Sequence, residues 1–276
     1  MNRALTTIHD RFISFVQRQP GVLGAWYFGS ASRGQSDQYS DLDVVFLLSG
    51  ERFPNASAQV TSWLADCCDR VILCWPEGFN GEAIVNNGYL LELDGEIVVY
   101  DVFLLNSDRL EDGICRMHYA DLQEDNVIFD RDGHVRALIA SNVPGTPWRD
   151  DVSRLISTYW YHAHLSAKYL LRGDFFKLEA VMRTLMDTHV SLLLTAFDRT
   201  TWGGSANKLH YLSAEQQQHL KKYGCTDDFA LMRANLRQCF LWFDADARAI
   251  APSEPTDAES VLACWLNQTK PLASDD

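Results

Sequence analysis

Apolar and polar positions follow two different periods in the first half of the chain. Residues 5–19 place Ile8, Phe12, Phe15 and Val16 at helical spacing, which predicts an amphipathic helix. Shorter apolar runs rich in β-branched and aromatic side chains predict buried strands, because such residues pack well on a pleated surface. These runs are residues 21–29, 41–48, 69–75, 88–105 and 126–133.

Turn residues divide this pattern. Asp94-Gly95 lies between two apolar stretches and predicts a β-hairpin within residues 88–105. Pro144, Gly145 and Pro147 fall within a few residues of one another and predict a break in regular structure. We therefore expect an α/β half, residues 1–145, followed by a second domain, residues 146–276.

The second half has helical periodicity almost throughout. Residues 151–174 predict a helix that stops at Gly173, and residues 177–197 predict another. Ser213 with Gln216, and Thr256 with Glu259, have the spacing of capping boxes that open later helices. Thr226, followed by two aspartates, is expected to open one more. The predicted fold class is α+β, with a C-terminal α-helical bundle.

Composition and net charge reduce the number of functional classes that fit the chain. The chain has 276 residues, 47% hydrophobic and 22% charged, as in a globular protein. Its formal net charge is −13 and no basic stripe is visible, which argues against a long nucleic acid as partner. Such a surface would draw a small cationic substrate. No signal region or membrane-length apolar run is present, and the seven cysteines form no CxxC pair, so we expect a cytoplasmic protein with no membrane partner.

Two carboxylates open the strand at residues 41–48. Asp41 and Asp43 point to the same side of a strand, roughly 7 Å apart along the backbone. Carboxylates held so close repel each other unless a divalent cation lies between them. Hard oxygen ligands in small number suit Mg²⁺, which takes its other ligands from water and phosphate. The pair therefore predicts a metal site that handles a phosphorylated substrate.

A phosphate cradle is predicted just upstream. Gly29 allows close backbone approach, and Ser30 offers a hydroxyl and an N–H group. If a helix starts near residue 30, its first amides are unpaired donors for an anion. Arg33 follows the cradle and is a candidate phosphate contact, although a solvated arginine fits the position equally well.

A third acid is expected on a neighbouring strand. Asp101 is the one acid embedded in a wholly apolar run, and we assign it as a metal ligand and candidate general base. Glu92, across the Asp94-Gly95 turn, is the alternative base.

These elements together resemble the nucleotidyltransferase superfamily of DNA polymerase beta. Gly29-Ser30, a gap of ten residues, Asp41-Leu42-Asp43, and later Asp101 between hydrophobics reproduce the family pattern. Within it, residues 29–43 are most similar to the lincosamide- and aminoglycoside-modifying enzymes. The resemblance implies a nucleotidyltransferase-fold domain with a mixed sheet and helices at residues 1–145, and a substrate-binding helical domain at residues 146–276.

The same resemblance implies a reaction. Asp41, Asp43 and Asp101 would act as catalytic residues that bind two Mg²⁺ ions, and Gly29 and Ser30 would hold the phosphates of ATP or another nucleoside triphosphate. A hydroxyl of a small acceptor, a lincosamide or aminoglycoside antibiotic, would attack the α-phosphorus and release pyrophosphate. Lys168 and Lys208 are candidate triphosphate contacts, and a homodimer is compatible with the family.

Other functions stay open at this level. The acceptor could be a protein or an RNA end, as in toxin–antitoxin modules. A non-catalytic nucleotide-binding module is a further alternative, although it should have lost one of the three acids. The identity of the acceptor, the preferred nucleotide and the oligomeric state are not fixed by the sequence.

Overall fold

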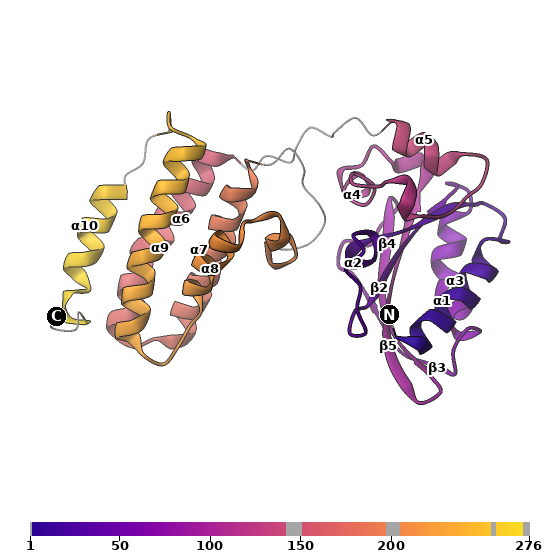
Figure 1. Cartoon of the computed structure of the whole chain (residues 1–276), viewed down its shortest axis with the longest axis horizontal. Coiled ribbons are helices and arrows are strands. Elements are labelled where there is room, and N and C mark those ends of the chain that lie inside the picture. The colour runs from indigo at the N-terminus through magenta and orange to yellow at the C-terminus, as the bar shows by residue number, and fades with distance from the viewer. Residues whose placement is uncertain (1, 142–150, 197–204, 255–257, 273–276) are drawn as a thin grey trace. The chain divides into compact units, whose positions relative to one another are not determined.

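The computed structural model describes residues 2–141, 151–196, 205–254 and 258–272 (Figure 1). The chain divides into two compact units, residues 1–145 and 146–276. The Pro144 to Pro147 break and the Thr256 capping box lie outside the described residues. No helix in the described ranges is long and apolar enough to cross a membrane.

The first unit is built on one six-stranded sheet in the order β3-β4-β5-β2-β1-β6. The pair β2/β5 is parallel and the other pairs are antiparallel, so the sheet is mixed. Asp94 and Gly95 both have positive φ and close the β4–β5 hairpin, as predicted. The strands are β1 (Val22–Tyr27), β2 (Leu42–Leu48), β3 (Arg70–Pro76), β4 (Ile84–Leu93), β5 (Glu96–Asn106) and β6 (Val127–Asp130).

Helices cover both faces of this sheet (Figure 1). The helices α1 (Arg3–Val16) and α3 (Phe53–Ala65) share one apolar core with one side of the strands. The short helix α4 (Gly113–Arg116) and α5 (His134–Ser141) share a second core with the other side. The sequence pattern did not predict α3, α4 or α5. The remaining short elements are α2 (Gly29–Ser32), η1 (Ser107–Arg109) and η2 (Glu124–Asn126).

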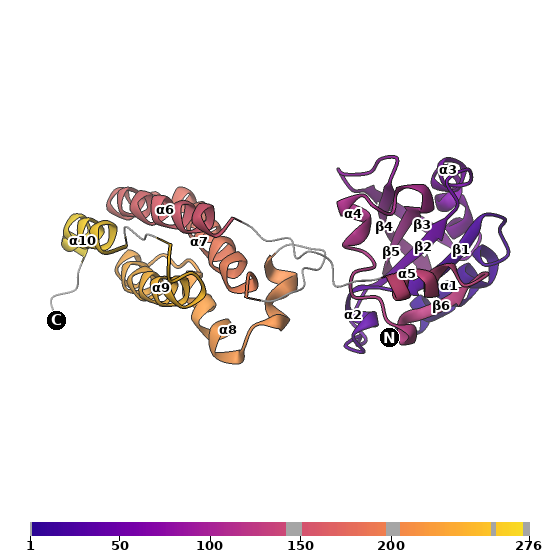
Figure 2. The same cartoon turned by 90° about the horizontal axis from the view of Figure 1, so that it is seen from above.

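The second unit is helical, and with the mixed sheet of the first it confirms the predicted α+β class. Figure 2 shows its long helices α6, α7 and α9 side by side, in agreement with their mutual contacts. Gly173 ends α6 in the left-handed conformation, and Ser213 with Gln216 forms the predicted capping box. The elements are α6 (Val152–Arg172), α7 (Phe175–Leu194), η3 (Ser205–Tyr211), α8 (Ala214–Leu220), η4 (Lys221–Tyr223), α9 (Phe229–Ile250), α10 (Ala258–Gln268) and η5 (Lys270–Leu272).

One predicted helix start is wrong by two residues. Asp228, not Thr226, is the N-cap of α9, and its carboxylate accepts the Leu231 amide at 2.9 Å. Thr226 instead accepts the Asp228 amide at 2.8 Å through its hydroxyl. Both residue types suit N-caps, so composition alone does not choose between them.

Candidate active site

Asp43 and Asp101 lie directly opposite each other on the parallel strands β2 and β5. Their neighbours Leu42 and Tyr100 are also paired, and both are buried in the core formed with α1 and α3. Because side chains alternate along a strand, both carboxylates point to the opposite side of the sheet. The pairing brings together two acids that are 58 positions apart in the sequence.

The acids influence one another electrostatically. Burial, with the charges of Asp41 and Asp101, raises the pKa of Asp43 to about 7, and Arg33 opposes that rise. Burial, with the charges of Asp41 and Glu77, raises the pKa of Asp101 to about 6. Asp41 is exposed and precedes β2 by one residue. The arrangement is a cluster of acidic side chains at the start of β2 and midway along β5.

The turn after β1 is fitted to Asp43. The Phe28 amide donates to the Asp43 carbonyl at 3.0 Å, and α2 begins at the next residue, close to the predicted start. Gly29 has φ +58°, and a Cβ at this position would overlap the Asp43 carboxylate. Only glycine satisfies both the backbone angle and the space. The predicted cradle therefore begins in direct contact with a predicted metal ligand.

Ser30 and Arg33 lie in the same turn. The Ser30 hydroxyl is 3.3 Å from the Ser36 hydroxyl, which ties the turn to the loop before β2. The Arg33 side chain is exposed, and its Nε donates to Gln35 Oε1 at 3.2 Å. Arg33 is close enough to Asp43 to oppose the rise in its pKa, and Ser30 directly follows the glycine that lies against the Asp43 carboxylate. Their assignment to phosphate stays a prediction.

His9 of α1 connects β1 and β5 on the sheet side opposite the carboxylates. The buried His9 ring lies 2.9 Å from the Tyr100 hydroxyl through Nδ1 and 3.0 Å from the Tyr27 hydroxyl through Nε2. Tyr100 directly precedes Asp101, and Tyr27 directly precedes the Phe28-Gly29 turn. Asn126 Nδ2 of η2 donates to the Ser32 carbonyl at 2.8 Å. The turn is therefore held by residues of both α1 and η2.

The structure adds site residues that the sequence pattern did not indicate. Glu77, just after β3, is close enough to raise the pKa of Asp101. Gly88 pairs with Asp101 across β4 and β5, and a Cβ on it would lie 2.8 Å from Asp101 Oδ1. A glycine inside an apolar strand run was the available signal, since such a glycine often marks close approach of another group.

The alternative base lies elsewhere on this face. Glu92 is four residues along β4 from Gly88, roughly 13 Å at the rise of a strand. Its Oε2 accepts from Arg70 Nη2 at 2.7 Å in an ion pair. Glu92 is therefore occupied by Arg70 and distant from Asp101.

The donor chemistry of the cluster fits Mg²⁺. Asp41, Asp43 and Asp101 supply hard carboxylate oxygens, and a cation between them would relieve the repulsion that raises two of their pKa values. Within the described ranges, no three His, Cys, Asp or Glu side chains already surround one point at ligand distance. The three ligand assignments stay predictions.

The two candidate lysines belong to the second unit. Lys168 on α6 is exposed and lies with His164 and Arg172 along a groove of about 450 Å³ that Gln268 of α10 also lines. Lys208 lies in η3. Their assignment to the triphosphate also stays a prediction.

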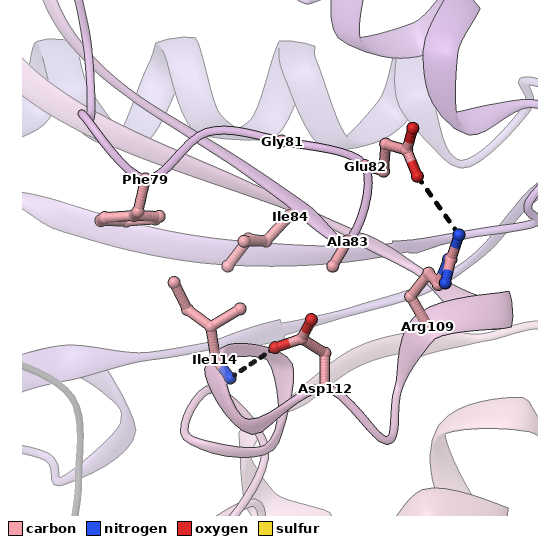
Figure 3. Close-up of a pocket in the computed structure, with 8 residues that line it drawn as sticks. All are labelled: Phe79, Gly81, Glu82, Ala83, Ile84, Arg109, Asp112 and Ile114. Carbon is pink, nitrogen blue, oxygen red and sulfur yellow. Dashed lines mark hydrogen bonds and ion pairs between the residues drawn. The ribbon is translucent and has the colours of Figure 1, made fainter.

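A separate pocket of about 230 Å³ lies at the other end of β4 (Figure 3). Phe79, Ile84 and Ile114 line it, and an exposed ion pair between Arg109 and Glu82, 3.2 Å apart, lies at its edge. Ile84 pairs with Leu105, four residues beyond Asp101 on β5. None of the predicted site residues lines this pocket.

Comparison with known proteins gives matches among solved structures alone. No family model and no curated protein matches the chain. An aminoglycoside 6-adenyltransferase from Bacillus subtilis is 14% identical, with a TM-score of 0.42 over 99% of both chains. A nucleotidyltransferase-like protein from Exiguobacterium sibiricum is 11% identical, with a TM-score of 0.33 over 97% of this chain and 73% of its own. Because these values are low, the function of this chain has to be inferred from its own residues.

Proposed function

We propose that this protein is a Mg²⁺-dependent nucleotidyltransferase that moves AMP from ATP onto a hydroxyl of a small molecule and releases pyrophosphate. A lincosamide or an aminoglycoside is the first acceptor class to test. One observation carries the proposal: Asp43 lies in register with Asp101 and in contact with the Gly29 turn. This register supports a shared site for the proposed metal ligands, base and phosphate cradle, where the Gly29 turn meets β2 and β5.

Each residue has a defined part in the proposed reaction. The amides at the start of α2 and the Ser30 hydroxyl bind phosphate oxygens of the nucleotide. Asp41, Asp43 and Asp101 hold two Mg²⁺ ions, which supply Lewis-acid neutralisation of phosphate charge when bound. Asp101 accepts the proton of the acceptor hydroxyl, and Arg33 adds positive charge beside the cradle.

The bond changes balance without a further reactant. The acceptor oxygen bonds to the α-phosphorus, and the bond from that phosphorus to the bridging oxygen breaks. The hydroxyl proton goes to Asp101, and pyrophosphate carries away the electron pair of the broken bond. In such transfers the protein contributes chiefly by positioning and by neutralising charge.

The test is pyrophosphate release with Mg-ATP in the presence of lincosamides, aminoglycosides or no acceptor. Asp43→Asn serves as the control because it removes one ligand charge at nearly constant shape. Release that needs one drug class and is lost in the control supports the proposal and names the acceptor class. Label transferred from ATP to a protein or an RNA redirects the acceptor, and ATP binding without any turnover points to a non-catalytic module.

A further inference from the structure

The sheet face that carries Asp101 has a partly uncovered apolar area beside that carboxylate. Trp75 and Leu73 on the edge strand β3 are 61% and 49% exposed, and Ile97 and Val99 on β5 are 62% and 39% exposed. Leu90 on β4 lies between these strands, paired with both Leu73 and Val99. We call Leu73, Trp75, Leu90, Ile97 and Val99 the apolar floor. Trp75 and Ile97 are among the most exposed large apolar side chains of the described residues.

Strand register joins this floor to the candidate active site. Trp75 pairs with Gly88, and Gly88 pairs with Asp101, so the three lie in one row across the sheet. A Cβ on Gly88 would lie 2.8 Å from Asp101 Oδ1 and 3.9 Å from Trp75 Cε3. The glycine thus lets the Asp101 carboxylate lie close to the β4 backbone, with the Trp75 indole ring on the other side of the same position. A glycine within a strand weakens it, and close approach of another group is a common reason for such a glycine.

The floor has defined edges. At one end, Phe103 and Leu105 of β5 belong to the core that α4 and α5 cover. At the other end, Arg70 and Glu92 form an ion pair across β3 and β4. An exposed apolar patch with a polar rim is typical of a binding surface, and on an edge strand it is otherwise a liability for aggregation.

We propose that this floor binds the acceptor, and that the acceptor is an amphipathic small molecule with an apolar ring face beside its reactive hydroxyl. The proposal rests on the proposed function and deepens it. The ring packs on Trp75 and Leu73, while the hydroxyl reaches the Asp101 carboxylate where it lies beside Gly88. A fully polar polycation would leave the exposed indole without a partner, so the floor selects ring-bearing acceptors over purely polar ones.

Trp75 is a specificity-determining residue in this arrangement. Its flat indole offers a large stacking surface at low cost in side-chain entropy, and such contacts add to the energy of burying apolar area. Leu73 and Val99 extend the surface without polar groups, which favours ring carbons over charged substituents. The charged groups near the floor include Asp101, Glu77 and the Arg70–Glu92 ion pair, and Asp41 and Asp43 lie beyond Asp101.

The test is direct binding to the full chain labelled with 5-fluorotryptophan and followed by fluorine NMR. Trp75→Phe assigns the resonance of residue 75. The probes are 4-nitrophenyl β-glucoside and methyl β-glucoside, which share their sugar hydroxyls and differ in the apolar ring. We expect the aryl probe to shift the Trp75 resonance saturably and the methyl probe to leave it unchanged.

Trp75→Ala should weaken aryl binding about tenfold. Phe176→Ala, which removes a side chain that is 81% exposed on α7, should not weaken it.

Three outcomes overturn the proposal. The Trp75 resonance could stay still with the aryl probe, or it could move equally with both probes. Sedimentation could also show a dimer that Trp75→Ala dissociates, which would make a second copy the occupant of the floor.

Pyrophosphate assays on the same variants separate this proposal from the proposed function. Release that continues with an unchanged acceptor KM in Trp75→Ala overturns the floor alone. A Trp75 shift with no release from any acceptor overturns the proposed function and leaves the floor supported.

Discussion

The backbone of Gly29 lies against the carboxylate of Asp43, with no room for a Cβ between them. Asp43 in turn accepts the Phe28 amide through its carbonyl at 3.0 Å. The turn that is predicted to hold phosphate therefore contacts Asp43 twice, once at its backbone carbonyl and once at its side-chain carboxylate. Any movement of that turn must change the surroundings of the Asp43 carboxylate.

Gly29→Ala should abolish nucleotidyl transfer and lower stability. The new methyl group would displace the Asp43 carboxylate, and the positive φ costs about 1–2 kcal/mol for a residue with a Cβ. Gly34→Ala is the matched control, since Gly34 has φ +65° but nothing within 4 Å of its Cβ position. Thermal melts and pyrophosphate release would be measured for both. Comparable losses of activity in the two variants would show that the contact with Asp43 is not what matters.

Asp43→Asn should raise the melting temperature measured in EDTA while abolishing turnover. Asp43 is half-buried beside Asp41 and Asp101, so its charge is repelled in the folded state and solvated in the unfolded state. Adding Mg²⁺ should stabilise the wild type, because a ligand that binds the folded state shifts the equilibrium by mass action. The variant should lose most of that gain.

The control for this experiment is Asp125→Asn, an exposed aspartate in η2. It should respond to Mg²⁺ as the wild type does. Equal stabilisation of wild type and Asp43→Asn by Mg²⁺ would exclude Asp43 as a ligand.

The choice of general base can be settled with three substitutions. Asp101→Asn should lower kcat by about 10²–10⁴-fold if Asp101 takes the proton. Glu92→Gln should leave kcat within about twofold, because its ion pair with the exposed Arg70 contributes little. Glu77→Gln should shift the pH dependence of kcat, because the Glu77 charge raises the pKa of Asp101. Steady-state kinetics across pH would decide, and a large loss in Glu92→Gln alone would return the base to Glu92.

The features that the sequence predicted correctly are those that depend on the spacing of residues close together in the chain. The isolated acid in an apolar run was Asp101, and β2 contains Asp43 as the apolar run predicted, although it begins at Leu42 and leaves Asp41 one residue before the strand. The Asp94-Gly95 turn and the Gly173 helix end were equally local signals. Each depends on neighbouring residues in the chain, and so each could be predicted without tertiary structure.

The features that were missed depend on register between strands. Gly88 lies next to Asp101 because the two pair across β4 and β5, and Trp75 of β3 pairs with Gly88 from the other side. Glu92 was the alternative base because the hairpin turn is close in sequence, yet the register places Arg70 beside it instead. Periodicity gives the face on which a residue lies but not its partner on the next strand.

His9 should make the folded state sensitive to acid. Burial lowers the pKa of His9 to about 4, against about 6.5 in an unfolded chain. Between these values the unfolded state binds a proton that the folded state does not, so stability is full above pH 6.5 and falls as pH drops toward 4. The loss from this one residue is on the order of 3 kcal/mol across that window. Burial lowers the pKa of His118 to about 4 as well, so His118 adds a loss of the same sign.

Urea unfolding of wild type and His9→Gln from pH 4 to pH 8 would check this. Gln can keep a hydrogen bond to the hydroxyl of Tyr27 or Tyr100 without titrating, so the two curves of unfolding free energy should converge as pH falls below 6.5. His134→Gln, at an exposed position in α5, should run parallel to the wild type. If the His9→Gln curve also stays parallel down to pH 4, the ring is protonated in the folded protein, and it bonds Tyr27 and Tyr100 as an imidazolium.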